Sequence, residues 1–93
     1  MKLLVIGSGM MGSAAAYDMA CQSQVDSVTL ADSDLKRARD VAARVNRITG
    51  AKKVRAVAID ASREKEAVRL MKGHDGALSA VPYLLNQIGR AHV

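Results

Sequence analysis

Three glycines near the start of the chain have a spacing that suits close contact with a ligand. The segment reads Gly7-Ser8-Gly9-Met10-Met11-Gly12, a G-x-G-x-x-G pattern. The first glycine permits a tight turn, the second lets the backbone approach a pyrophosphate, and the third lets a helix pack closely on a strand. The N–H groups and the dipole at the start of the next helix would hold the negative charge. The alternative is a glycine-rich turn without a ligand.

A single acidic residue follows the glycines at a distance that indicates a nucleotide. Asp32 stands 20 residues after Gly12, at the end of a second apolar segment. A carboxylate there accepts hydrogen bonds from the adenosine ribose and repels a 2′-phosphate, which predicts NAD as the cofactor. Lys36 and Arg37 could bend towards such a phosphate, so NADP stays open, and Arg37 could also be a plain surface residue. Ser33, next to Asp32, completes this part of the candidate site.

Two further segments complete the candidate cofactor residues. Asp60 and Ala61 follow a third apolar segment, where they would border the adenine, although Asp60 and Ser62 could simply cap a helix. The nicotinamide would project past the end of a fourth apolar segment, at Ala80, Val81 and Pro82. We assign no catalytic residue and no metal, since the two histidines lie far apart in the sequence.

Apolar segments alternate with helical patterns along the whole chain. Strands are expected at 3–6, 28–31, 54–59 and 76–81. Helices are expected over 10–21, from a cap at Ser33 to Gly50, and from a cap at Ser62 to Gly73. With right-handed crossovers, this βαβαβαβ order predicts an α/β fold of the Rossmann type, with four parallel strands in the order 3-2-1-4. The glycines and Ala80 to Pro82 then meet at one crevice.

Length and composition exclude several classes of protein. A chain of 93 residues builds one core. The aromatic residues are Tyr17 and Tyr83, too few for the stacking platforms that bind single-stranded nucleic acid. Cys21 is the only cysteine, which excludes an internal disulfide or a cysteine-cluster zinc site and fits a reducing cytoplasm. We expect Cys21 to be a small buried residue.

The methionines are expected to fill gaps in the core. Their unbranched, flexible side chains suit irregular spaces between helices and strands. Four of them are interpreted in this way: Met10, Met11, Met19 and Met71.

The net charge of +5 has a local origin. Eight basic residues lie between Lys36 and Arg55, against the single acid Asp40. They alternate with apolar residues at helical spacing, which favours a solvated outer face of a helix over attraction to nucleic acid. No motif that reads RNA or DNA is present, so we expect no nucleic-acid partner. The uncharged stretch from Leu3 to Tyr17 is too short for a membrane helix, so we expect no membrane partner either.

Several segments taken together resemble one family of enzymes. They are Met1 to Ala15, Val28-Thr29-Leu30-Ala31-Asp32, Ile59-Asp60-Ala61 and Ala80-Val81-Pro82-Tyr83. They are similar to the amino-terminal NAD(P)-binding domain of the saccharopine dehydrogenase family, and most similar to its L-lysine 6-dehydrogenase branch. The resemblance implies oxidation of an amine on an amino acid, with hydride passed to the nicotinamide and the imine hydrolysed. It also implies a parent homo-oligomer whose catalytic residues follow later in the chain, so that the fragment itself is inactive.

The resemblance covers residues 1–87, which we expect to form an incomplete dinucleotide-binding domain. Residues 88–93 fit it poorly, and one choice of codons for them, ATC GGA AGA GCA CAC GTC, spells the start of a common sequencing adapter. They are therefore predicted to be a non-native tail, the alternative being an ordinary polar end.

A regulatory module of a different class shares part of this pattern. The NAD-sensing domains that control potassium uptake also begin with the glycine motif and an acidic end of the second strand. They usually carry an acidic pair after the fourth strand, where this chain has Pro82-Tyr83-Leu84-Leu85-Asn86. The difference favours the enzyme.

Overall fold

Four parallel strands and three helices alternate along the described part of the chain. The computed structural model describes residues 1–7, 9–60 and 63–79. In chain order the elements are β1 (Lys2–Ile6), α1 (Met10–Ala20), β2 (Ser27–Asp32), α2 (Leu35–Thr49), β3 (Val54–Ala58), α3 (Glu64–Lys72) and β4 (Gly76–Ser79). The strands form one sheet in the order β3-β2-β1-β4, and every pairing is parallel. The predicted Rossmann-type α/β fold and its strand order are confirmed.

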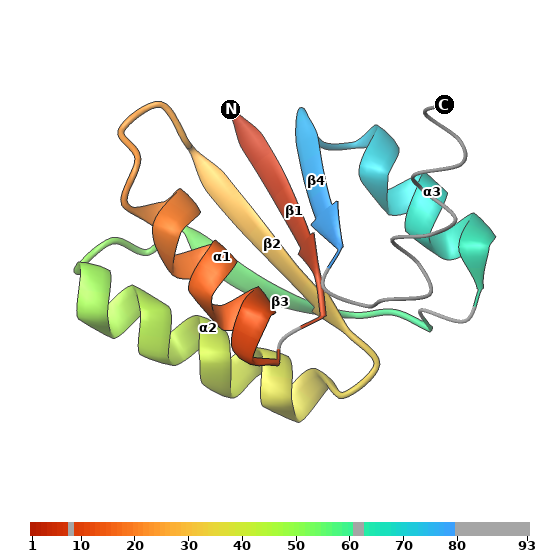
Figure 1. Cartoon of the computed structure of the whole chain (residues 1–93), viewed down its shortest axis with the longest axis horizontal. Coiled ribbons are helices and arrows are strands. Elements are labelled where there is room, and N and C mark those ends of the chain that lie inside the picture. The colour runs from red at the N-terminus through yellow and green to blue at the C-terminus, as the bar shows by residue number, and fades with distance from the viewer. Residues whose placement is uncertain (8, 61–62, 80–93) are drawn as a thin grey trace.

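One face of the sheet carries the larger hydrophobic core. Figure 1 shows α1 and α2 side by side on this face. Alternate strand residues point into it, Val5 from β1 and Leu30 from β2 among them, and they meet Ala16 of α1 and Val41 of α2. Small side chains along α1 let that helix lie close to the sheet. The registers Val5↔Leu30 and Leu30↔Ala56 place these side chains in one row across the strands.

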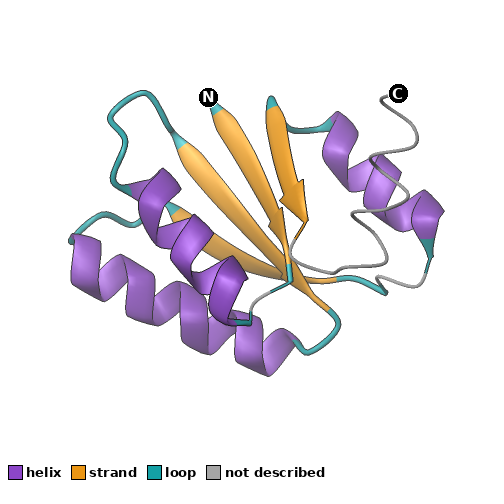
Figure 2. Cartoon of the chain, in the orientation of Figure 1, coloured by secondary structure: helices purple, strands orange, loops and turns teal. Residues whose placement is uncertain are grey.

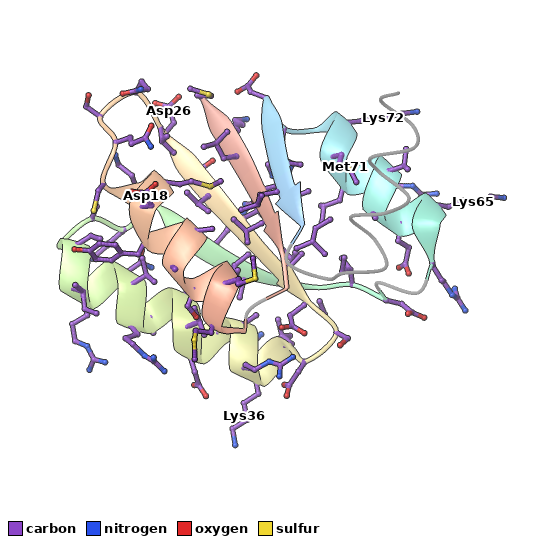
Figure 3. All side chains as sticks on the ribbon, viewed as in Figure 1. Asp18, Asp26, Lys36, Lys65, Met71 and Lys72 are labelled. Atoms are coloured by element: carbon purple, nitrogen blue, oxygen red, sulfur yellow. The ribbon has the colours of Figure 1, made fainter. Side chains whose placement is uncertain are left out.

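The opposite face carries a smaller core beneath α3. Leu4 and Ile6 of β1 pack there with Ala31 of β2 and Ala67 of α3. Figure 2 shows α3 apart from the other two helices, and in Figure 3 Met71 points from α3 towards the sheet. Among the described residues, this face is covered by α3 and the other by α1 and α2.

Several element boundaries differ from those expected. Asp34, not Ser33, is the N-cap of α2, and its side chain accepts a hydrogen bond from the backbone N–H of Arg37. Ser33 is instead the residue whose hydroxyl reaches back to Asp32. The expected left-handed residue at the end of α2 is confirmed, since Gly50 has φ of 73°. The N-cap of α3 is Arg63, and the proposed cap Ser62 lies outside the described residues.

Two expectations about burial were wrong. Cys21 is exposed, because it forms the C-cap of α1, one position beyond the last residue that packs on the sheet. Met10 and Met11 are 91% and 70% exposed, since they form the first turn of α1, away from the core. Met19 and Met71 do pack against the two cores, as expected. In the part of the chain that the structure describes, no helix is both long and apolar enough to cross a membrane.

The basic residues of α2 lie where the helical pattern predicted. Lys36, Arg39, Arg44 and Arg47 are exposed, whereas Val41 and Val45 on the same helix are buried. Lys36 points away from the body of the molecule in Figure 3. The excess charge between Lys36 and Arg55 therefore includes a solvated helix face.

Candidate dinucleotide site

The candidate site begins where β1 turns into α1. Gly7 has φ of 99°, a conformation that side chains rarely tolerate, and its N–H donates to the carbonyl of Ala31 over 2.7 Å. This hydrogen bond extends the pairing of β1 with β2 by one residue before the chain turns. The first glycine of the motif is thus required by the backbone itself.

Gly12 is required by packing. An added Cβ at this position would lie 1.8 Å from the carbonyl oxygen of Gly7 and 2.7 Å from its carbon. Atoms that are not bonded to each other never come this close, so any side chain at Gly12 would force α1 away from β1. The third glycine of the motif therefore sets how closely the helix approaches the strand.

Gly9 differs from both of these glycines. It is the N-cap of α1, with φ of −67°, a value that every residue type adopts. An added Cβ would meet nothing within 4 Å of it in the described structure. Neither folding nor packing requires a glycine here, so the position keeps an open space directly before the helix.

The start of α1 offers backbone donors without a competing side chain. Among the described residues, no side chain caps this helix and its first turn contains no acid. The N–H groups of the first turn and the positive end of the helix dipole therefore suit an anion. Met10 and Met11 present apolar surface at the same place.

Asp32 ends β2 next to the glycine turn. The residue is 5% exposed, and its register partner is Ala58 of β3. One carboxylate oxygen, Oδ1, accepts from the backbone N–H of Asp34 over 3.0 Å and from the hydroxyl of Ser33 over 3.3 Å. These bonds hold a buried carboxylate in place at the edge where the carboxyl ends of the strands meet.

Arg37 reaches back from α2 to the same carboxylate. Its Nε lies 3.3 Å from Oδ2 of Asp32, and its Nη2 lies 3.2 and 3.1 Å from Oδ1 and Oδ2. The hydrogen bonds from this guanidinium to Asp32 raise the pKa of Arg37 above its ordinary value. The Arg37 side chain is still 56% exposed, against 4% for that of Asp32. Arg37 is thus an exposed residue that forms an ion pair with Asp32, because α2 packs beside β2.

Asp60 lies beyond the end of β3. The backbone N–H of Ile59 donates to the carbonyl of Asp32 over 3.0 Å, which keeps the two strand ends together. The Asp60 carboxylate is exposed and forms an ion pair with Arg63 at 3.5 Å. It does not occupy the N-cap position of α3, which Arg63 takes. The remaining candidates, Ser8, Ala61, Ala80, Val81 and Pro82, lie outside the described residues, as does the predicted tail 88–93.

The structure thus brings the glycine turn, the start of α1 and the Asp32 and Arg37 pair to one edge of the sheet. This is the edge at which the strands end, where open α/β sheets bind their ligands. No group of side chains suited to a metal ion occurs among the residues described.

Comparisons with known proteins identify the family and the fold of the chain. Residues 3–87 match the saccharopine dehydrogenase NADP-binding domain family. Quinate dehydrogenase from Corynebacterium glutamicum in complex with NAD is 27% identical, with a TM-score of 0.70 over 87% of this chain.

Two other solved structures share the fold. Saccharopine dehydrogenase (L-Glu forming) from Saccharomyces cerevisiae is 22% identical, with a TM-score of 0.66 over 88% of this chain. Malate dehydrogenase from Salinibacter ruber is 18% identical, with a TM-score of 0.57 over 87%. The chain spans only 27%, 17% and 37% of the quinate, saccharopine and malate dehydrogenase chains respectively. With nearly its whole length matched, the chain belongs to the saccharopine dehydrogenase NADP-binding domain family.

Proposed function

We propose that this chain is the dinucleotide-binding domain of an NAD(P)-dependent amino-acid oxidoreductase of the saccharopine and lysine dehydrogenase type. The observation that carries the proposal is the open space at Gly9. The fold does not need a glycine there, whereas a diphosphate lying against the backbone does. The family assignment supports a dehydrogenase over a potassium-uptake sensor.

The backbone of the glycine turn would hold the diphosphate. Gly7 bends the chain so that the N–H groups of Met10 and Met11 lead the helix, and Gly12 keeps that helix close to β1. These groups together form an anion site whose geometry exists before the ligand arrives. When bound, the cofactor's nicotinamide supplies the hydride acceptor.

Asp32 and Arg37 would face the adenosine ribose. The Asp32 carboxylate can accept from ribose hydroxyls, which favours NAD. Arg37 already lies on that carboxylate, so a 2′-phosphate would find a guanidinium beside the acid that repels it. We propose NAD as the preferred cofactor and NADP as a weaker ligand, whose 2′-phosphate would interact favourably with Arg37.

The substrate would be an amine on an amino acid, oxidised to an imine that water then hydrolyses. This part of the proposal rests on the family alone. We assign no catalytic role to any residue of the chain, and the activity belongs to a longer protein of the length of the dehydrogenases that the chain matches.

Titration with NAD and NADP, followed by calorimetry, tests the binding role. We expect Gly9→Ala to weaken both nucleotides at least tenfold while the thermal midpoint stays unchanged, because its Cβ enters ligand space only. Gly73→Ala is the matched control: it also has room, its nearest neighbour being 3.7 Å away, but lies far along the chain after α3. Unchanged binding in Gly9→Ala would refute the placement of the diphosphate.

The same titration tests the ribose contact. Asp32→Ser removes the carboxylate and should lower the preference for NAD over NADP. If the unmodified domain bound NADP at least as tightly as NAD, the role given to Asp32 would be wrong.

A further inference from the structure

A cavity lies on the α3 face of the sheet, separate from the glycine turn. Its volume is about 450 Å³, within the range of small-molecule sites. Its described lining comes from the starts of β1 and β2, from β3, and from α3 and the turn after it. Lys2, Arg55 and Arg69 contribute cationic side chains from three different elements, and Glu66 contributes an acid.

The sheet register places hydroxyl groups between two of these cations. Ser27 is the partner of Lys2, and Thr29 is the partner of Arg55. Residues two apart on a strand share a face, so both hydroxyls point to the cavity side of β2. Neighbouring strands are about 4.8 Å apart, so Lys2 and Arg55 flank the hydroxyls on either side.

The positive charge of the cavity is not neutralised by ion pairs. Within residues 1–7, 9–60 and 63–79, none of Lys2, Arg55 and Arg69 makes a salt bridge. Asp75 follows His74, and its carboxylate, which accepts from the backbone N–H of Lys2 over 2.6 Å, places one negative charge beside this group of cations. One isolated surface cation attracts little, whereas several around a concave surface attract anions together.

His74 fixes the hydroxyl on the floor of the cavity. Its Nδ1 is 2.8 Å from the carbonyl of Leu70, which can only accept, so Nδ1 carries a proton. Its Nε2 is 2.9 Å from Oγ1 of Thr29, a residue that is 1% exposed. In the neutral ring Nε2 therefore accepts the Thr29 proton.

We propose that this cavity binds a small anion carrying a carboxylate or a tetrahedral oxyanion group. Lys2, Arg55 and Arg69 supply the positive charge, and His74 holds the Thr29 hydroxyl in place between the strands that carry Lys2 and Arg55. Glu66 is the lining acid that opposes the anion. The proposal is independent of the dinucleotide site.

NMR titration of the full chain with sulfate and with succinate tests the proposal. Sulfate is a tetrahedral oxyanion, and succinate shows whether carboxylates bind equally. We expect saturable shifts of the amides around Thr29, Arg55 and His74, with millimolar or tighter affinity.

Variants distinguish binding in this cavity from nonspecific attraction of the anion to the positively charged chain. Arg55→Gln should weaken sulfate about tenfold, whereas Arg44→Gln, which removes an exposed cation from α2, should leave binding unchanged. Absence of saturation, or equal weakening by the two arginine variants, would overturn the site.

Discussion

The side-chain amide of Asn46 makes two hydrogen bonds to the backbone of Val54, one to its carbonyl and one from its N–H. Nδ2 of Asn46 donates to the carbonyl of Val54 over 2.8 Å, and the N–H of Val54 donates to Oδ1 over 3.0 Å. Asn46 lies in the last turns of α2, and Val54 begins β3. The amide thus ties the end of the helix to the start of an edge strand.

Replacing this amide should destabilise the fold. Asn46→Ala leaves both backbone groups of Val54 without their partner, and Val54 is only 5% exposed. We expect a loss of about 2 kcal/mol in the free energy of unfolding, measured by urea denaturation. Arg44→Ala on the same helix should stay within about 0.5 kcal/mol of the unmodified chain. Equal losses would mean that the paired amide contributes nothing specific.

Gly12→Ala should strongly destabilise the fold, although it adds only one methyl group. The new Cβ would collide with backbone atoms of Gly7, which cannot rotate away as a side chain can. We expect a loss of about 3 kcal/mol or failure to fold. Urea denaturation beside Gly9→Ala gives the comparison, and a Gly12→Ala variant as stable as Gly9→Ala would contradict the close packing of α1 on β1.

Arg37 should strengthen the binding of NADP but not that of NAD. Arg37→Met keeps the length of the side chain but removes the guanidinium that lies on Asp32. If the proposed ribose site is correct, NADP binding falls about tenfold, the usual effect of losing a charged hydrogen bond, while NAD binding does not weaken. Lys36→Met, which alters a side chain pointing into solvent, is the control. Calorimetry that finds the same change for both nucleotides would argue against this role.

The amino terminus should make stability depend on pH through Asp26. The ammonium group of Met1 donates to the Asp26 carboxylate, and this hydrogen bond lowers the pKa of Asp26 below its ordinary 3.8. A lowered folded pKa means that the stabilisation is present above that ordinary value and is lost as the pH falls through the folded value. Asp26→Asn should therefore be less stable than the unmodified chain at pH 6, and the difference should shrink at pH 3.

Urea denaturation at the two pH values measures this difference. Asp18→Asn provides the control, since Asp18 makes no ion pair in the described part of the chain and stands apart from Asp26 in Figure 3. A gap between the unmodified chain and Asp26→Asn that is the same at both pH values would exclude the link to the Asp26 carboxylate.

The chain by itself should not oxidise amino acids. It spans 27%, 17% and 37% of the three dehydrogenase chains compared above, and none of its residues has an assigned catalytic role. Incubation with NAD and a panel of amino acids that includes lysine, followed by the absorbance of the reduced cofactor, should give no signal above the blank. Sustained turnover would show that the catalytic groups lie within these 93 residues.

The order of the strands and the glycine turn could be predicted from the sequence, because both depend on local signals. Apolar runs and helical spacing identify each element, the crossover rule then orders the sheet, and G-x-G-x-x-G marks the turn at Gly7.

Other features follow from contacts between distant segments. The sequence places Arg37 where it could reach a 2′-phosphate, but its ion pair with Asp32 depends on the packing of α2 beside β2. Likewise His74 and Thr29 stand 45 positions apart, and only the packing of α3 on the sheet joins them. The expectations for Met10 and Cys21 were wrong for the same reason: an apolar residue is buried only where another element covers it, and these two lie at the start of α1 and just after its end.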